Sequence, residues 1–344
     1  MTVVVLFFLA FSLLLYVLLG GADFGAGIIE LFSSKKNQDI TKRTVYRVMG
    51  PVWEANHIWV IILIVILWIA FPKYYKIMVT SLHIPITLML LGITLRGVAF
   101  VFRHYDAYVD ESQRIYNWLF RISSLITPIF LGMVFGGMVS SKIIIVDETT
   151  RSFSEAYITP WLNTFSILVG LFFASLCAFL SAVLLIGEAN DEGYPVYVRK
   201  AKTATIVVVI MGFITISYGY LNKLPFVNGI VTDKLSIGLI ILSAICLIPL
   251  WYFVKKGSRI ISRTFAGLQV VLIIAVAIIP HFPNSLLIKN GSLNLFESMA
   301  PSSVINVLGI SLLIGGAIIL PGLFHLLKSF KLIKILERPN TSSK

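Results

Sequence analysis

Nine long apolar stretches run through this chain, and they constrain its fold more than any other feature of the sequence. A helix of about 20 apolar residues crosses a bilayer core about 30 Å thick. Each stretch is close to or above that length, so we expect an all-α, polytopic transmembrane protein of about nine helices. The expected helices are approximately 3–32, 52–71, 77–102, 118–140, 161–186, 203–221, 235–254, 265–280 and 303–327.

The composition agrees with a membrane protein and excludes a nucleic-acid-binding domain. Charged residues make up only 13% of the chain, whereas a soluble domain carries about a quarter. The net charge of +12 does not form one basic stripe, because the Lys and Arg residues lie in short clusters between the apolar stretches. The two cysteines, Cys177 and Cys246, lie inside apolar stretches without CxxC spacing, so we interpret them as buried small hydrophobes.

The distribution of basic residues predicts the orientation of the helices. With the N-terminus outside, 20 Lys and Arg residues fall on the cytoplasmic side and seven on the external side. Such an excess is typical of cytoplasmic segments, so the sequence predicts an external N-terminus and a cytoplasmic C-terminus. No connection is long enough for a separate folded domain. We therefore expect one membrane domain over residues 1–344, ending in a cytoplasmic tail at 336–344.

The first polar group inside an apolar stretch is Asp23, in the sequence GGADFGAG at residues 20–27. An ionised side chain at mid-bilayer costs about 2.5–3.5 kcal/mol on insertion scales and usually faces protein or water. Asp23 is thus either a functional group or a hydrated residue at the cytoplasmic end of its helix. Gly21 and Gly25 have GxxxG spacing, as do Gly132 and Gly136, which indicates close helix packing.

A second polar group opens the next stretch, in GPVWEANHIW at residues 50–59. Glu54 and His57 are three residues apart and share a helix face, and Asn56 adds a donor and an acceptor. Together these groups can form a short proton relay, although an interfacial capping cluster is the alternative. The indoles of Trp53 and Trp59 flank this group and are expected to make structural or partner contacts.

The third polar group is Arg96, in LRGVAFVFR at residues 95–103. It either extends to the interface or pairs with Asp23 or Glu54 from neighbouring helices. The predicted topology brings all three residues toward the cytoplasmic side, which favours one shared site. His83 and His325 form no convincing pair of axial ligands, so we do not expect this chain to bind haem or a metal.

These motifs together resemble those of subunit II of cytochrome bd-type quinol oxidases. The resemblance rests on GGADFGAG, GPVWEANHIW, AFPKYY at residues 70–75 and LRGVAFVFR, in this order, within the first third of the chain. The family usually has Asp-Gly-Asn-Glu after GPVW, whereas this chain has Glu54-Ala55-Asn56-His57. The replacement of the second acid by His57 argues against a relay of carboxylates alone.

The resemblance implies two four-helix bundles plus a peripheral helix, and a position in the bacterial cytoplasmic (inner) membrane. It also implies a partner, subunit I, which holds two haems b and one haem d, oxidises quinol and reduces O₂ to water. This chain would bind no haem of its own and would help form a cytoplasmic proton path through Asp23, Glu54, Asn56, His57 and Arg96. Membrane lipid, quinone and a small single-helix subunit are further implied partners.

Two other functions stay open at this point. A proton-coupled secondary transporter shares the helix count and the embedded acids, but transporters of that kind favour inverted repeats, and no convincing repeat is seen. A purely structural subunit that shields its partner from lipid is the second alternative, and Asp23 and Glu54 are hard to explain that way.

Overall fold

A computed structural model describes residues 1–49, 53–105, 112–145, 152–188 and 193–329. The side chains of a few helix residues, Glu54 among them, are outside this description, as is the predicted tail at 336–344. The described chain is almost entirely helical, with eight helices that are long and apolar enough to cross a membrane and a shorter apolar helix at Ala55–Ala70. Together these fall on the nine predicted stretches, which confirms the all-α transmembrane fold.

The first half of the chain forms four membrane-crossing segments and one amphipathic helix. The first segment is divided into an α-helix, a π-helical turn and a second α-helix. The elements are α1 (Thr2–Leu15), η1 (Tyr16–Gly20), α2 (Gly21–Leu31), α3 (Lys35–Met49), α4 (Trp53–Ala70), α5 (Pro72–Tyr105) and α6 (Ser112–Val139). Helix α5 bends where Leu82 leaves helical geometry, three residues before Pro85, because proline removes a backbone donor and crowds the preceding turn.

The second half contains five further long helices and the short elements that connect them. Its elements are α7 (Phe153–Tyr157), α8 (Thr164–Ile186), α9 (Tyr194–Leu221), α10 (Pro225–Thr232), α11 (Lys234–Lys255), α12 (Arg259–Ile278), η2 (Ile279–His281), β1 (Leu286–Ile288), β2 (Gly291–Leu293), η3 (Phe296–Ser298) and α13 (Ser302–Ser329). Several helices begin before their apolar stretch does. Helix α9, for example, starts nine residues before Thr203, because hydropathy marks only the part that lies in lipid.

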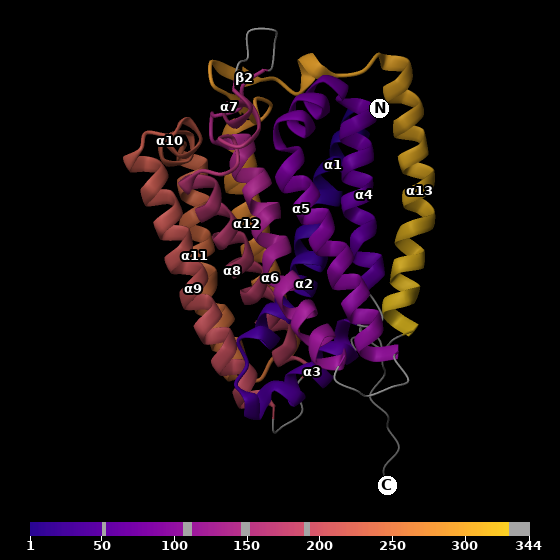
Figure 1. Ribbon diagram of the computed structural model, residues 1–344, viewed down its shortest axis with the longest axis vertical. Helices are drawn as coiled ribbons and strands as arrows, with labels where there is room; N and C mark the ends of the chain where they lie inside the picture. The colour runs from indigo at the N-terminus through magenta and orange to yellow at the C-terminus, as the bar shows by residue number, and fades with distance from the viewer. Residues whose placement is uncertain (50–52, 106–111, 146–151, 189–192, 330–344) are drawn as a thin grey trace.

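The long helices form two groups of four, with α13 at one edge (Figure 1). The first group comprises α1–α2, α4, α5 and α6, and the second comprises α8, α9, α11 and α12. Helix α13 contacts α1 and α4 only along one side and exposes much of the rest of its surface. This arrangement confirms the two bundles and the peripheral helix that the resemblance implies.

Helix α8 joins the two bundles, because both GxxxG pairs pack against it. A Cβ atom added to Gly25 would lie 1.9 Å from the Cys177 carbonyl oxygen, and one added to Gly132 would lie 2.7 Å from Cα of Gly170. Small residues thus let the backbones of α2 and α6 approach α8 directly. The prediction that these glycines serve helix packing is confirmed.

A small antiparallel hairpin, β1–β2, lies at the end of the molecule opposite to α3 (Figure 1). Its Lys289 donates a backbone hydrogen bond to the Ile143 carbonyl and pairs through its side chain with Glu155 at 2.9 Å. At the α3 end, Arg263 donates to Glu188 and to the Leu184 carbonyl at the end of α8. The Glu188 side chain is only 11% exposed and is held by this pair.

Candidate functional site

The site is built around an ion pair between α2 and α5. Arg96 donates from Nη1 to Asp23 Oδ2 at 2.7 Å and from Nη2 to Asp23 Oδ1 at 2.6 Å. The two side chains are only 1% and 0% exposed. The prediction that Arg96 pairs with Asp23 is therefore confirmed, and the alternatives of a hydrated Asp23 and an Arg96 that extends to the interface are wrong.

Arg96 also has acceptors that do not depend on the carboxylate. Its Nη2 donates to the backbone carbonyl of Asp23 at 3.1 Å, and its Nε donates to Ser124 Oγ on α6 at 3.0 Å. The guanidinium carbon lies 5.3 Å from the centre of the Phe24 ring and 5.0 Å from that of Phe120, which adds cation–π attraction. Arg96 is thus held in place by two helices, α2 and α6.

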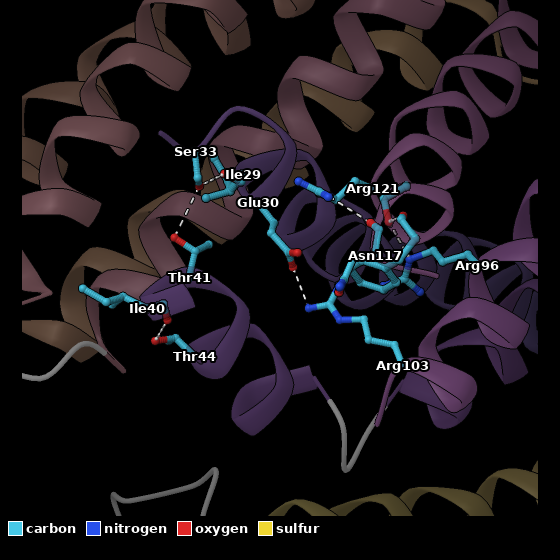
Figure 2. Close-up of polar contacts among 12 residues, drawn as sticks. Ile29, Glu30, Ser33, Ile40, Thr41, Thr44, Arg96, Arg103, Asn117 and Arg121 are labelled. Atoms are coloured by element: carbon cyan, nitrogen blue, oxygen red, sulfur yellow. Dashed lines mark hydrogen bonds and ion pairs between the residues drawn. The ribbon is translucent and has the colours of Figure 1, made fainter. Parts of the chain in front are cut away.

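A second buried ion pair lies two helical turns nearer to the α3 end. Arg103 Nη2 donates to Glu30 Oε2 at 2.8 Å, and both side chains are almost fully buried. Figure 2 shows the two side chains pointing toward each other, with Arg96 and Asn117 on the far side of Arg103. The Arg103 guanidinium carbon stands 4.5 Å from the centre of the Phe120 ring. One aromatic ring therefore contacts both arginines.

The Glu30–Arg103 pair was not among the predicted site residues, although the sequence carries a signal for it. Glu30 follows Asp23 by seven residues, and Arg103 follows Arg96 by seven residues. Seven residues are about two turns and about 10 Å of helix, so equal spacings on two helices that run in the same direction form two matched pairs.

A third polar group lies beyond Glu30, where α2 ends (Figure 2). Ser33 donates to the Ile29 carbonyl at 2.6 Å and to Thr41 Oγ1 on α3 at 3.3 Å. Lys200 from α9 donates to Ser33 Oγ and, at 2.9 Å, to Thr41 Oγ1. The three groups form a polar series that starts near the predicted cytoplasmic surface and leads through Glu30 to Asp23.

The residues predicted from the second motif lie on α4 beside this series. His57 is half-buried, with ring centres 6.0 Å from Phe24 and 6.4 Å from Tyr16, and Asn56 is buried. Glu54 belongs to the first turn of α4, but its side chain is outside the described part of the structure, so its part in the site stays a prediction. His57 thus lies beside Phe24, the neighbour of Asp23, and its part in a proton path stays a prediction.

Trp53 and Trp59 contact neighbouring helices of this chain. The Trp53 ring packs on Phe100 with ring centres 5.3 Å apart, and an added Cβ on Gly97 would lie 3.2 Å from it. Trp59 is buried and meets Phe11 edge to face. Both indoles therefore stabilise α4 against α5 and α1, and a contact with a partner subunit stays a prediction.

The described histidines do not gather into a metal or haem site. His83 is exposed on α5 and lies edge to face with Tyr157, whereas His325 is exposed on α13. Among the described residues, no group of three or more His, Cys, Asp or Glu side chains is placed to hold a metal ion. The buried ionisable groups are instead arranged as acid–base pairs.

Comparison with known proteins identifies relatives over nearly the whole chain. The sequence profile of the family "Cytochrome bd terminal oxidase subunit II" matches residues 1–330. Cytochrome bd ubiquinol oxidase subunit 2 of Bacillus subtilis is 26% identical over 77% of this chain and 75% of its own length. Cytochrome bd-I ubiquinol oxidase subunit 2 of Escherichia coli K12 is 23% identical over 55% of this chain and 48% of its own length.

A solved structure has the same fold. A chain of the bd oxidase from Geobacillus thermodenitrificans superposes with a TM-score of 0.77, covering 97% of this chain and 100% of that one, at 18% sequence identity. At 18% sequence identity, this similarity shows a shared fold and no more.

Proposed function

The chain belongs to the family of cytochrome bd terminal oxidase subunit II, and we propose that its buried polar series carries protons inward from the cytoplasmic side. As a member of this family it is a subunit of a quinol-oxidising complex in the bacterial inner membrane. Reduction of O₂ to water consumes protons, so an oxidase needs a polar route through its apolar helices.

The observation that supports this proposal most directly is that Arg96 has hydrogen-bond acceptors besides the Asp23 carboxylate. When a proton reaches Asp23, the carboxylate loses its charge and the pair with Arg96 weakens. Arg96 still keeps the Asp23 carbonyl and Ser124 Oγ as acceptors. When Asp23 takes up a proton, Arg96 therefore keeps hydrogen-bond acceptors, but its charge loses the counter-ion, which costs free energy and favours release of the proton.

The order of the groups supports a direction of transfer. Lys200, Ser33 and Thr41 lie where α2 ends, Glu30 lies one turn further in, and Asp23 lies about 10 Å beyond Glu30. Each carboxylate is paired with an arginine, so the series has little net charge to repel an incoming proton. Glu54, Asn56 and His57 extend the series onto α4 in this proposal.

We assign the haem groups to a partner subunit, as the family resemblance implies. This chain then contributes helices, proton-bearing side chains and contact surface, and quinol oxidation takes place in the partner. The end of the molecule that contains α3 carries most of the clustered basic residues and would face the cytoplasm. The β1–β2 hairpin would then lie outside. A small single-helix subunit, lipid and quinone are further proposed partners of the complex.

Two alternatives have weaker support. The comparisons offer nothing in favour of a proton-coupled secondary transporter. A purely structural subunit would explain the helix packing, but two buried acid–base pairs stabilise a fold less than well-packed apolar residues do. Their presence is better explained by a role in moving charge.

The proposal is tested by Asp23→Asn and Glu54→Gln in the purified oxidase complex. Each change removes a proton-binding carboxylate with little change of shape, so quinol oxidase turnover should fall at least about tenfold, as for loss of a general acid–base group. The haem absorption spectrum should persist.

Glu155→Gln is the matched control, because Glu155 is an exposed carboxylate on the predicted external side. It should leave turnover unchanged. Normal turnover in both the Asp23 and the Glu54 variants, with a normal haem spectrum, would rule out the relay and favour the structural subunit.

A further inference from the structure

Two buried polar atoms, one on η1 and one on α4, have no hydrogen-bond partner in the described structure. They are the Tyr16 hydroxyl, on a side chain only 2% exposed, and His57 Nδ1. The centres of the two rings are 6.4 Å apart. A buried polar atom left unpaired costs about 1–3 kcal/mol, so each one in a native protein calls for a partner.

The local backbone places Tyr16 in this position. Tyr16 opens the π-helical turn η1, which lies between α1 and α2. A π-turn inserts one extra residue into a helix, which rotates the preceding residues by about 100° relative to those that follow. Tyr16 is thereby turned off the face that carries Asp23 and Glu30. An added Cβ on Gly20 would lie 3.0 Å from the Tyr16 ring, so Gly20 makes room for it.

The Tyr16 and His57 rings lie near the ion pair of the site. The Phe24 ring, next to Asp23, has its centre 6.0 Å from that of the His57 ring and 5.3 Å from the guanidinium carbon of Arg96. One turn before Tyr16, the hydroxyl of Ser12 is also fully buried and has no hydrogen-bond partner among the described residues. Unpaired polar atoms therefore continue from Asp23 toward the middle of the membrane.

We propose that Tyr16 and His57 hold an internal water molecule between η1 and α4, which extends the proton series inward from Asp23. A water bridge of two hydrogen bonds of about 2.8 Å each joins polar atoms up to about 5–6 Å apart, and two rings whose centres are 6.4 Å apart can bring their polar atoms within that reach. Tyr16 donates its hydroxyl proton to the water oxygen, and the water donates to His57 Nδ1. Buried waters typically satisfy such groups.

This inference rests on the proposed function, because a bound water at this place has a role only if Asp23 passes protons. The water accepts one proton from the Asp23 side and passes another to His57 Nδ1, so that no net charge stays on the water. Tyr16 acts as a positioning residue for this water.

The first test is a cryo-electron microscopy map of the wild-type complex at a resolution that shows ordered water. Density between Tyr16 Oη and His57 Nδ1, absent in a map of Tyr16→Phe, is the expected result. An empty gap, or a direct Tyr16–His57 hydrogen bond, overturns the proposal. This measurement does not depend on enzyme activity.

The second test is the turnover of Tyr16→Phe in H₂O and D₂O. Loss of the hydroxyl should slow turnover about threefold or more and increase the solvent isotope effect. Tyr74→Phe is the matched control, since Tyr74 is equally buried but its hydroxyl is bonded to Ser285 beside the external hairpin. It should leave both quantities unchanged.

The two proposals fail in different ways. If Asp23→Asn slows the oxidase while Tyr16→Phe matches Tyr74→Phe in rate and isotope effect, the water site is refuted and the proton series through Asp23 stands. If Asp23→Asn and Glu54→Gln both leave turnover normal, the proton series itself is refuted, and with it the role proposed for the water.

Discussion

At the scale of single residues, the two buried ion pairs cost desolvation free energy, and each pair has a specific position between the helices. Taking an isolated charge out of water costs several kcal/mol even after relaxation. In the Asp23–Arg96 pair, two helices, α2 and α6, supply the hydrogen-bond acceptors of the guanidinium. In the Glu30–Arg103 pair, Nε and Nη1 of Arg103 have no hydrogen-bond partner in the described structure, and Phe120 covers the guanidinium instead. The outer pair is therefore the less satisfied of the two.

Removing one member of the outer pair should destabilise the complex strongly. Arg103→Met leaves the Glu30 carboxylate buried without its partner, at a cost of about 3–5 kcal/mol. The double variant Glu30→Leu with Arg103→Met should recover most of this loss, because no unpaired charge is left. The measurement is the thermal unfolding midpoint of the purified complex.

The exposed pair of Lys289 and Glu155 supplies the control for this experiment. These side chains are 60% and 51% exposed, so Lys289→Met should cost less than about 1 kcal/mol. An Arg103→Met complex as stable as the Lys289→Met complex would contradict the view that the buried pair depends on its partner.

The residue-level predictions from sequence succeeded where a charge was plainly embedded. Asp23 and Arg96 lie well inside apolar stretches. Because burying a charge without a partner costs much free energy, a partner could be expected for each. Glu30 and Arg103 lie near helix ends, where water is an equally good partner, so only the matched spacing of seven residues distinguishes them. Tyr16 could not be predicted, because a π-turn that reorients it has no clear sequence signal.

At the scale of helices, α8 is the element on which the two bundles meet. Glycines of α2 and α6 let their backbones contact it, and Gly25 makes the closest approach. The sequence predicted this packing from GxxxG spacing, but it did not say which helix the glycines would contact. Spacing along one helix carries no information about its neighbour.

Gly25→Ala should weaken the contact between α2 and α8. The added Cβ would lie 1.9 Å from the Cys177 carbonyl oxygen, so the helices must separate, and overpacking of this kind costs about 1–3 kcal/mol. The expected result is a lower unfolding midpoint of the complex and lower oxidase turnover, because Asp23 lies on the same helix.

Gly238→Ala is the matched control, because no heavy atom lies within 4 Å of a Cβ at that position in α11. It should be neutral or slightly stabilising, since alanine favours the helix. If Gly25→Ala behaved like Gly238→Ala, the close packing of α2 on α8 would not be important for stability.

At the scale of the whole molecule, the uneven distribution of basic residues gives the two ends of the bundle different characters. The end with α3 and the turn between α11 and α12 carries most of the Lys and Arg residues, and the opposite end carries the hairpin, α7 and α10 (Figure 1). The fold is compatible with either orientation in a bilayer, because apolar helices have no preferred direction. Orientation follows instead from the cytoplasmic preference of basic segments.

Cysteine labelling in intact cells tests this orientation. Lys223 lies in the exposed turn after α9, and Lys256 lies in the exposed turn after α11, at opposite ends of the molecule. The two native cysteines are buried, so a membrane-impermeant maleimide should react only with an introduced one. Lys223→Cys should be labelled in spheroplasts, and Lys256→Cys only after the membrane is permeabilised. The reverse pattern would place Glu30 and Lys200 on the external side, and a proton series that begins there could not draw protons from the cytoplasm.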